Sequence, residues 1–245
     1  MASEGHQQVH KSEQKVKMAG KRRPTADAFC RGRLRWQRAD FLLPIEELLT
    51  THSDFFAAAM RKEWVEGQDR IVRLPEDDPD CFRMFASFLY TSAIHSLADG
   101  DHDGENLKDW EYQRLALAWT LGNKLICVAF QDAVVDALIN KLMTEGPQYP
   151  LGLYRGVYTM TAGSCGLRRL VVDITVFIWP IGQLAKAPAY SDCAEFYRDV
   201  AARLEGLNDE QRRYNPAFSA EGSGCTYHDH GTRPCYKTVI GGERT

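Results

Sequence analysis

The residues with the clearest chemistry lie near the C-terminus, where two cysteines and two histidines are closely spaced: Cys225, His228, His230 and Cys235. Two thiolates and two imidazoles form a tetrahedral ligand set that suits Zn²⁺, and spacings this short let one loop surround the ion. A bound zinc would also order a Gly- and Ser-containing segment that has no core of its own. The spacing differs from that of common zinc fingers, so a flexible polar tail without metal stays open as the alternative.

A second candidate is the acidic run Asp99, Asp101 and Asp103, which precedes Gly104 and is similar to the start of an EF-hand calcium loop. That loop needs a bidentate glutamate at position twelve, and Trp110 occupies this position here. We interpret the run as a solvated acidic loop.

Nucleophilic catalysis finds no support in the sequence. Ser164 and Ser223 lie in Gly-containing stretches, but neither has the GxSxG spacing of a nucleophile elbow. There is no GxxxxGK[ST] phosphate loop, and no GxGxxG follows a strand. His52 and His95 stand singly, where a structural or surface role is the ordinary one. We therefore expect no enzyme and no small-molecule substrate.

Composition places the chain among ordinary globular proteins. It has 245 residues, 44% of them apolar and 26% charged, which is enough for a sizeable core. The net charge of −3 hides an asymmetry, because residues 1–38 carry +7 and the remainder carries −10. We interpret residues 1–40 as a basic, disordered arm. Base readout of nucleic acid is disfavoured, since aromatic residues for stacking, such as Trp36, are few near the Lys/Arg cluster.

The cysteine usage and the hydropathy pattern indicate location. Seven cysteines without framework spacing, and no apolar leader in the first thirty residues, predict reduced thiols in the cytoplasm or nucleus. The longest apolar stretch, residues 170–181, is interrupted by Asp173 and is too short to span a bilayer. No membrane role is expected.

The elements that position these residues are clearest between residues 48 and 94. The sequence predicts a helix capped by Ser53, a strand over residues 70–74, and a second helix with Asp78 as N-cap and Pro79 at its first position. Apolar residues on one face of each element predict the structural anchors of this unit, which are Phe55, Phe56, Leu74, Phe82, Phe85, Leu89 and Tyr90.

The order HSxFF, acidic spacer, VRLPEDDPDxF and FxxFLYT closely resembles the BTB/POZ interaction domain of filamentous fungi. Residues 115–130, residues 131–142 and residues 167–177 resemble the helices that follow in that family, so the resemblance covers about residues 48–180. It implies an α+β, mainly helical fold: a helical cluster with a small sheet, followed by a helical C-terminal extension. The expected boundaries are 41–145 for the BTB/POZ-like domain, 146–207 for the helical extension and 208–245 for a flexible tail.

The front of the chain departs from the family pattern. Val9-His10-Lys11 resembles the element that normally runs straight into the first helix, but that helix lies more than thirty residues away. One hypothesis makes residues 14–47 an insertion, such as translated intron. The other lets Phe41–Leu43 supply the strand. Only eight residues precede Val9, so the opening strand used for dimerisation in the family is not assigned, and both homodimer and monomer stay open.

The resemblance implies a protein–protein interaction module that acts as an adaptor or scaffold. The expected partners are other proteins, including a second copy of the chain or a cullin. One alternative is therefore a substrate adaptor of a cullin-type ubiquitin ligase, although no separate substrate-binding repeat is present. A second alternative is a nucleic-acid-associated regulator that uses the basic arm and a zinc-bound tail.

Overall fold

The computed structural model describes residues 33–35, 43–96, 105–145, 153–178, 193–208, 210, 218 and 224–238, and these residues are mainly helical. The elements in chain order are β1 (Arg33–Arg35), α1 (Leu43–His52), α2 (Asp54–Ala59), α3 (Val65–Asp69), β2 (Ile71–Arg73), α4 (Pro79–Thr91), α5 (Glu105–Lys124), α6 (Val128–Glu145), α7 (Leu153–Met160), α8 (Gly166–Phe177) and α10 (Ala194–Glu205). Strands β1 and β2 pair antiparallel with Leu34 opposite Val72, and the described residues hold no wider sheet than this short ladder.

Both expected helix caps of the N-terminal unit are confirmed. The Ser53 hydroxyl accepts a hydrogen bond from the Phe56 N–H at the start of α2. The Asp78 carboxylate accepts one from the Asp80 N–H, with Pro79 in the first turn of α4. These bonds satisfy N–H groups that have no partner inside a helix. Because capping chemistry is local, the start of α4 could be predicted from sequence to the residue.

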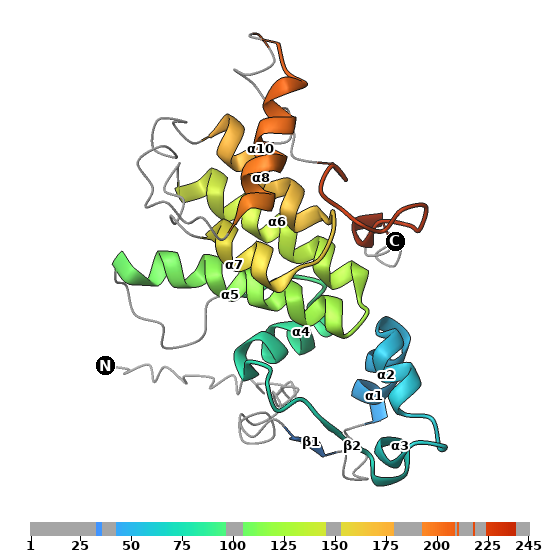
Figure 1. Ribbon diagram of the computed structural model, residues 1–245. Helices are drawn as coiled ribbons and strands as arrows, with labels where there is room; N and C mark the ends of the chain where they lie inside the picture. The colour runs from blue at the N-terminus through green and yellow to red at the C-terminus, as the bar shows by residue number, and fades with distance from the viewer. Residues whose placement is uncertain are drawn as a thin grey trace, which may run out of the picture.

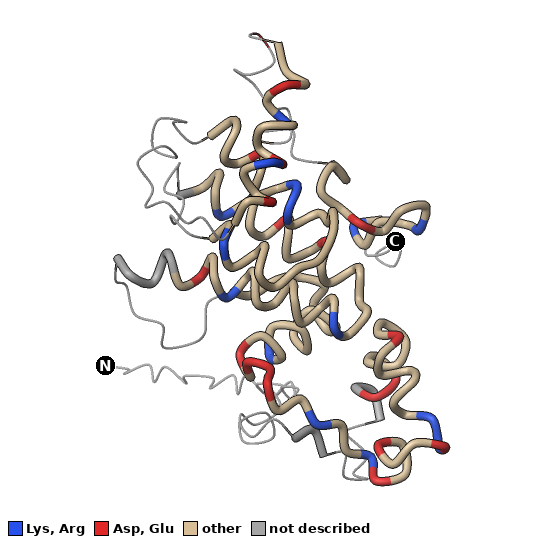
Figure 2. Tube along the Cα trace, viewed as in Figure 1, with Lys and Arg blue, Asp and Glu red and all other residues tan. Residues whose placement is uncertain are grey.

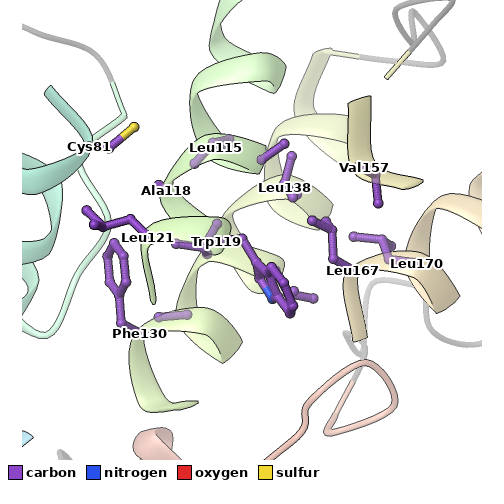
Figure 3. Close-up of a cluster of buried hydrophobic side chains, with 14 of the residues drawn as sticks. Cys81, Leu115, Ala118, Trp119, Leu121, Phe130, Leu138, Val157, Leu167 and Leu170 are labelled. Carbon is purple, nitrogen blue, oxygen red and sulfur yellow. The ribbon is translucent and has the colours of Figure 1, made fainter. Parts of the chain in front are cut away.

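A layer of helices surrounds the α5–α6 pair, which crosses the middle of the molecule (Figure 1). Helix α4 packs on one side, and α7, α8 and α10 pack on the other. Figure 3 shows side chains from these helices meeting in one continuous cluster. It contains Leu115, Trp119 and Leu138, and the last of these is 2% exposed. The expected interaction unit and the expected extension therefore share one core.

Six of the seven predicted anchors lie inside the fold. Phe56, Leu74, Phe82, Phe85 and Leu89 are all buried, and Phe55 is partly buried against the same cluster.

Tyr90 differs from this prediction, because its side chain is 52% exposed. It follows Leu89 directly, so it lies about 100° further round α4 and away from the face that packs on the core.

Part of the segment considered as an insertion belongs to the fold. Residues 43–47 lie in α1, and residues 33–35 form β1. The strand expected at Phe41–Leu43 is therefore wrong at Leu43, which begins α1, and the strand that pairs with β2 lies earlier, at residues 33–35. The other residues of the basic arm and of the candidate insertion lie outside the described residues. The same holds for Asp99, Asp101 and Asp103.

A buried ion pair joins α5 to α6. Lys141 Nζ lies 2.5 Å from Glu111 Oε2, and the two side chains are only 5% and 12% exposed. The ammonium also lies 5.0 Å from the ring centre of Tyr112. Removing one partner would leave an uncompensated buried charge, so the pair fixes how the two helices face each other.

Candidate metal centre

Residues 224–238 form a series of turns that lies against α6 and the beginning of α8 (Figure 1). Gly224 and Gly231 adopt the left-handed backbone conformation, with φ of 56° and 61°, which glycine enters at little cost. The His228 N–H donates to the Cys225 carbonyl at 3.1 Å. This packed segment differs from the flexible tail expected for residues 208–245.

The reason for the difference is an aromatic anchor. Tyr227 is 1% exposed, and its hydroxyl donates to Asp173 Oδ2 of α8 at 2.9 Å. Asp173 also accepts from Arg203 of α10 at 2.6 Å, so one carboxylate holds two segments. Although the tail is polar overall, a single large side chain fixes it to the core.

Hydrogen bonds at the start of α8 also hold the segment close to that helix. The Gly166 N–H donates to Asp229 Oδ2 at 2.6 Å, and Arg169 Nη2 donates to the His228 carbonyl at 3.2 Å. A Cβ atom on Gly166 would lie 1.9 Å from the Tyr227 carbonyl oxygen. The approach of the two backbones therefore requires glycine at this position.

These contacts bring the four candidate zinc ligands together. The side-chain sulfur and nitrogen atoms of Cys225, His228, His230 and Cys235 all lie within 4.8 Å of one another. Cys235 Sγ and His228 Nδ1 are 3.5 Å apart. Zn–S and Zn–N bonds of about 2.3 and 2.0 Å at a tetrahedral angle give about 3.5 Å between the two ligand atoms. The spacing thus fits two corners of one coordination tetrahedron.

The histidine hydrogen bonds select which nitrogen is available at each ring. His228 Nε2 lies 3.1 Å from Asp136 Oδ2, so the proton resides on Nε2 and the lone pair on Nδ1 faces Cys235. In zinc sites, a ligating histidine commonly donates its other N–H to a carboxylate, which fixes the orientation of the ring.

His230 has the opposite arrangement. Its Nδ1 lies 3.1 Å from the Gly231 carbonyl oxygen, which can only accept, so the proton resides on Nδ1. The lone pair is then on Nε2, which is buried and has no hydrogen-bond partner among the described residues. A buried nitrogen without a partner is costly unless a ligand satisfies it.

Asp136 supports the site from α6. Its Oδ2 also accepts from the Tyr236 hydroxyl at 2.5 Å and from Lys237 Nζ at 2.9 Å. Burial alone would raise the pKa of Asp136, but the hydrogen bonds from His228, Lys237 and Tyr236 outweigh it and hold the pKa below its ordinary value. The carboxylate is therefore ionised and can keep the His228 ring in place.

Asp132 lies one helical turn before Asp136. Its Oδ1 accepts from the Asp229 N–H at 2.8 Å, whereas its buried Oδ2 has no hydrogen-bond partner among the described residues. That oxygen is 4.0 Å from His228 Nδ1, and burial raises the pKa of the carboxyl group. It is a second buried polar atom near the four candidate ligands.

The sequence pattern indicates the four candidate ligands but not these two carboxylates. The available signal was the i, i+4 pair Asp132 and Asp136 within an otherwise apolar helix, because two charges on one turn of a buried helix need a partner.

The thiols of the two core cysteines Cys81 and Cys127 should be unreactive in the folded protein. Burial raises the pKa of Cys81 to about 12 and that of Cys127 to about 11. At about pH 9, where an ordinary thiol is largely ionised, both should stay protonated and resist iodoacetamide in the folded protein. Mass mapping after labelling, with and without urea, checks this. Rapid modification of either residue without urea would contradict it.

Comparison with protein-family models, with curated proteins and with solved structures found no match for this chain. Within the described part of the chain, no helix is long and apolar enough to cross a membrane.

Proposed function

We propose that this protein is a protein–protein interaction module that acts as an adaptor or scaffold through a BTB/POZ-like domain. Support comes from residues 48–94, where the helix, strand and helix that the resemblance implies are present as α2, β2 and α4. The segment expected as an acidic spacer holds the short helix α3. Their aromatic residues pack together, with Phe56, Phe82 and Phe85 within 5.9–6.5 Å of one another between ring centres. Large side chains in this unit build a rigid body.

Ser53 connects that unit to the central helix pair. Besides capping α2, its hydroxyl donates to the Leu125 carbonyl in the α5–α6 turn at 2.6 Å, and the residue is 1% exposed. The backbone of this turn is unusual, because Ile126 has a φ of 52°. A preorganised surface loses little conformational entropy on binding, which favours a docking role.

The observation that carries the proposal is a pair of exposed apolar side chains beside α3. Trp64 is the N-cap of α3 and Val65 is its first residue, and their side chains are 59% and 63% exposed. Tryptophan is among the residues most enriched in binding hot spots. A partner that covers this pair would remove about 25 cal/mol of unfavourable hydration per Å² of apolar surface buried.

The charges of the described residues add no comparable argument for nucleic acid. Figure 2 shows Lys and Arg interspersed with Asp and Glu along the described helices. Within the described part of the chain, the single group of three or more His, Cys and acidic side chains able to hold a metal is the one at residues 225–235. Its four protein ligands leave no coordination position for a substrate.

The test is a pull-down of tagged full-length protein from its own cell extract, comparing wild type with Val65→Asp. The matched control is Met143→Asp, which places the same charge at another exposed apolar position on α6. Both changes should alter stability by no more than about 0.5 kcal/mol, as surface substitutions do. We expect Val65→Asp to reduce partner recovery at least about tenfold while Met143→Asp retains it.

The identity of the recovered protein separates the two adaptor functions. Stoichiometric cullin, lost with Val65→Asp, would establish a ubiquitin-ligase adaptor. Recovery of a second copy of the chain alone would establish a self-associating scaffold. Equal recovery by wild type and both variants would contradict the proposed surface.

A further inference from the structure

We propose that Cys225, His228, His230 and Cys235 bind one zinc ion as a closed structural centre, and that this ion holds residues 224–238 in the conformation that packs against α6 and α8. The inference is independent of the proposed function. It rests on the approach of four ligand atoms within 4.8 Å, on the orphan nitrogen of His230 and on the carboxylate behind His228.

The donor set selects the metal. Two thiolates with two imidazoles in tetrahedral arrangement suit Zn²⁺, whereas Mg²⁺ and Ca²⁺ require oxygen ligands. A two-iron cluster with the same residue types places the thiolates on one iron and the imidazoles on the other. Here Cys235 Sγ and His228 Nδ1 are 3.5 Å apart, so a thiolate and an imidazole share one ion.

The surroundings indicate a structural ion. All four ligands come from the chain, whereas a catalytic zinc keeps one position open for water or substrate. His228 is 8% exposed and its ring is fixed from behind by Asp136. Two ionised thiolates would balance the charge of Zn²⁺.

The ion would fix the shape of a loop whose aromatic residues contact parts of the fold that are distant in sequence. Tyr236, next to the ligand Cys235, places its ring 6.2 Å from that of Phe88 in α4. Tyr227, next to His228, donates to Asp173 in α8. A loop closed by zinc therefore braces the interaction unit against the extension, because both aromatic contacts depend on the same loop.

The first experiment measures zinc and iron in purified full-length protein, for the wild type and for ligand variants. We expect one zinc per chain and no iron in the wild type, and loss of zinc from His230→Ala and Cys235→Ser. The matched controls are Cys193→Ser and His95→Ala. Cys193 is as buried as Cys235 but caps α10, where serine is a favoured residue. Both controls should keep the zinc.

A cobalt titration covers the case in which the ligand variants fail to fold. Co²⁺ added to chelated wild-type protein should give the intense visible bands of tetrahedral coordination together with a sulfur-to-cobalt charge-transfer band. Added Zn²⁺ should then abolish both. The proposal would be overturned if the wild-type protein is purified without zinc and also gives no tetrahedral cobalt spectrum. It would also be overturned if the control variants lose zinc to the same extent as the ligand variants.

Discussion

Removing the metal should lower the melting temperature of the protein by about 6–20 °C. The zinc would hold a loop whose burial includes Tyr227 and Cys235, and releasing large buried side chains costs about 3–5 kcal/mol. For a chain of this size each kcal/mol moves the melting temperature by about 2–4 °C. Scanning calorimetry with and without a strong chelator measures the shift, and added Zn²⁺ should reverse it.

The effect should be confined at first to the metal loop. Hydrogen exchange of the chelated protein should accelerate at the amides of His228 and Asp229, whose N–H groups bond to Cys225 and Asp132. The middle of α5 should stay protected, because local opening leaves the rest of the core intact. Cys193→Ser provides the control, since it should respond to chelation as the wild type does. A melting temperature that stays constant while the chelator removes the zinc would show that the ion has no structural role.

Replacing Gly166 by alanine should destabilise the protein by about 2–3 kcal/mol and weaken metal retention, as overpacking against an element that cannot yield does. The new Cβ would lie 1.9 Å from the carbonyl oxygen and 3.0 Å from the carbonyl carbon of Tyr227. These are backbone atoms, so no rotamer change relieves the overlap. Moving the loop would break the Gly166–Asp229 hydrogen bond and displace His228 from the site. Urea unfolding and metal analysis of the purified variant measure both effects.

Gly156→Ala is the matched control within α7. There the added Cβ meets only the Met160 Cε atom, at 3.7 Å, which is an ordinary contact. Glycine within a helix is less stable than alanine by about 0.5–1 kcal/mol, so this variant should be slightly more stable than the wild type. The two substitutions are chemically identical and should differ in sign. Equal destabilisation by both would contradict the close approach of the loop to α8.

Local chemistry explains which parts of the fold could be predicted from the sequence. The Asp78 cap and Pro79 define the start of α4 because both act within one helical turn. The four candidate metal ligands could be selected from the sequence because their types and spacing are themselves the signal. The mainly helical class is implied by the resemblance of residues 48–180 to the BTB/POZ domain, and the structure confirms it at that level.

Features that depend on distant residues could not be predicted in the same way. Lys141 is buried because Glu111 neutralises it across the α5–α6 pair, a contact between residues thirty positions apart. Residues 224–238 are packed because Asp173 accepts a hydrogen bond from Tyr227 and because Gly166 leaves room for the Tyr227 backbone. Composition alone indicates only a polar tail. Tyr90 was expected inside because it follows a buried stripe, but a helix turns it towards solvent. Each of these outcomes depends on how elements pack.

The central claim of the account is that one ion organises the C-terminal loop through a defined pair of histidine nitrogens. Long-range ¹H–¹⁵N correlation of the imidazole rings in metal-bound, full-length protein tests it most directly. We predict that His228 carries its proton on Nε2, hydrogen-bonded to Asp136, and binds through Nδ1. His230 should carry its proton on Nδ1 and bind through Nε2. Two rings that titrate freely with pH, or that both bind through the same type of nitrogen, would contradict the geometry of the site.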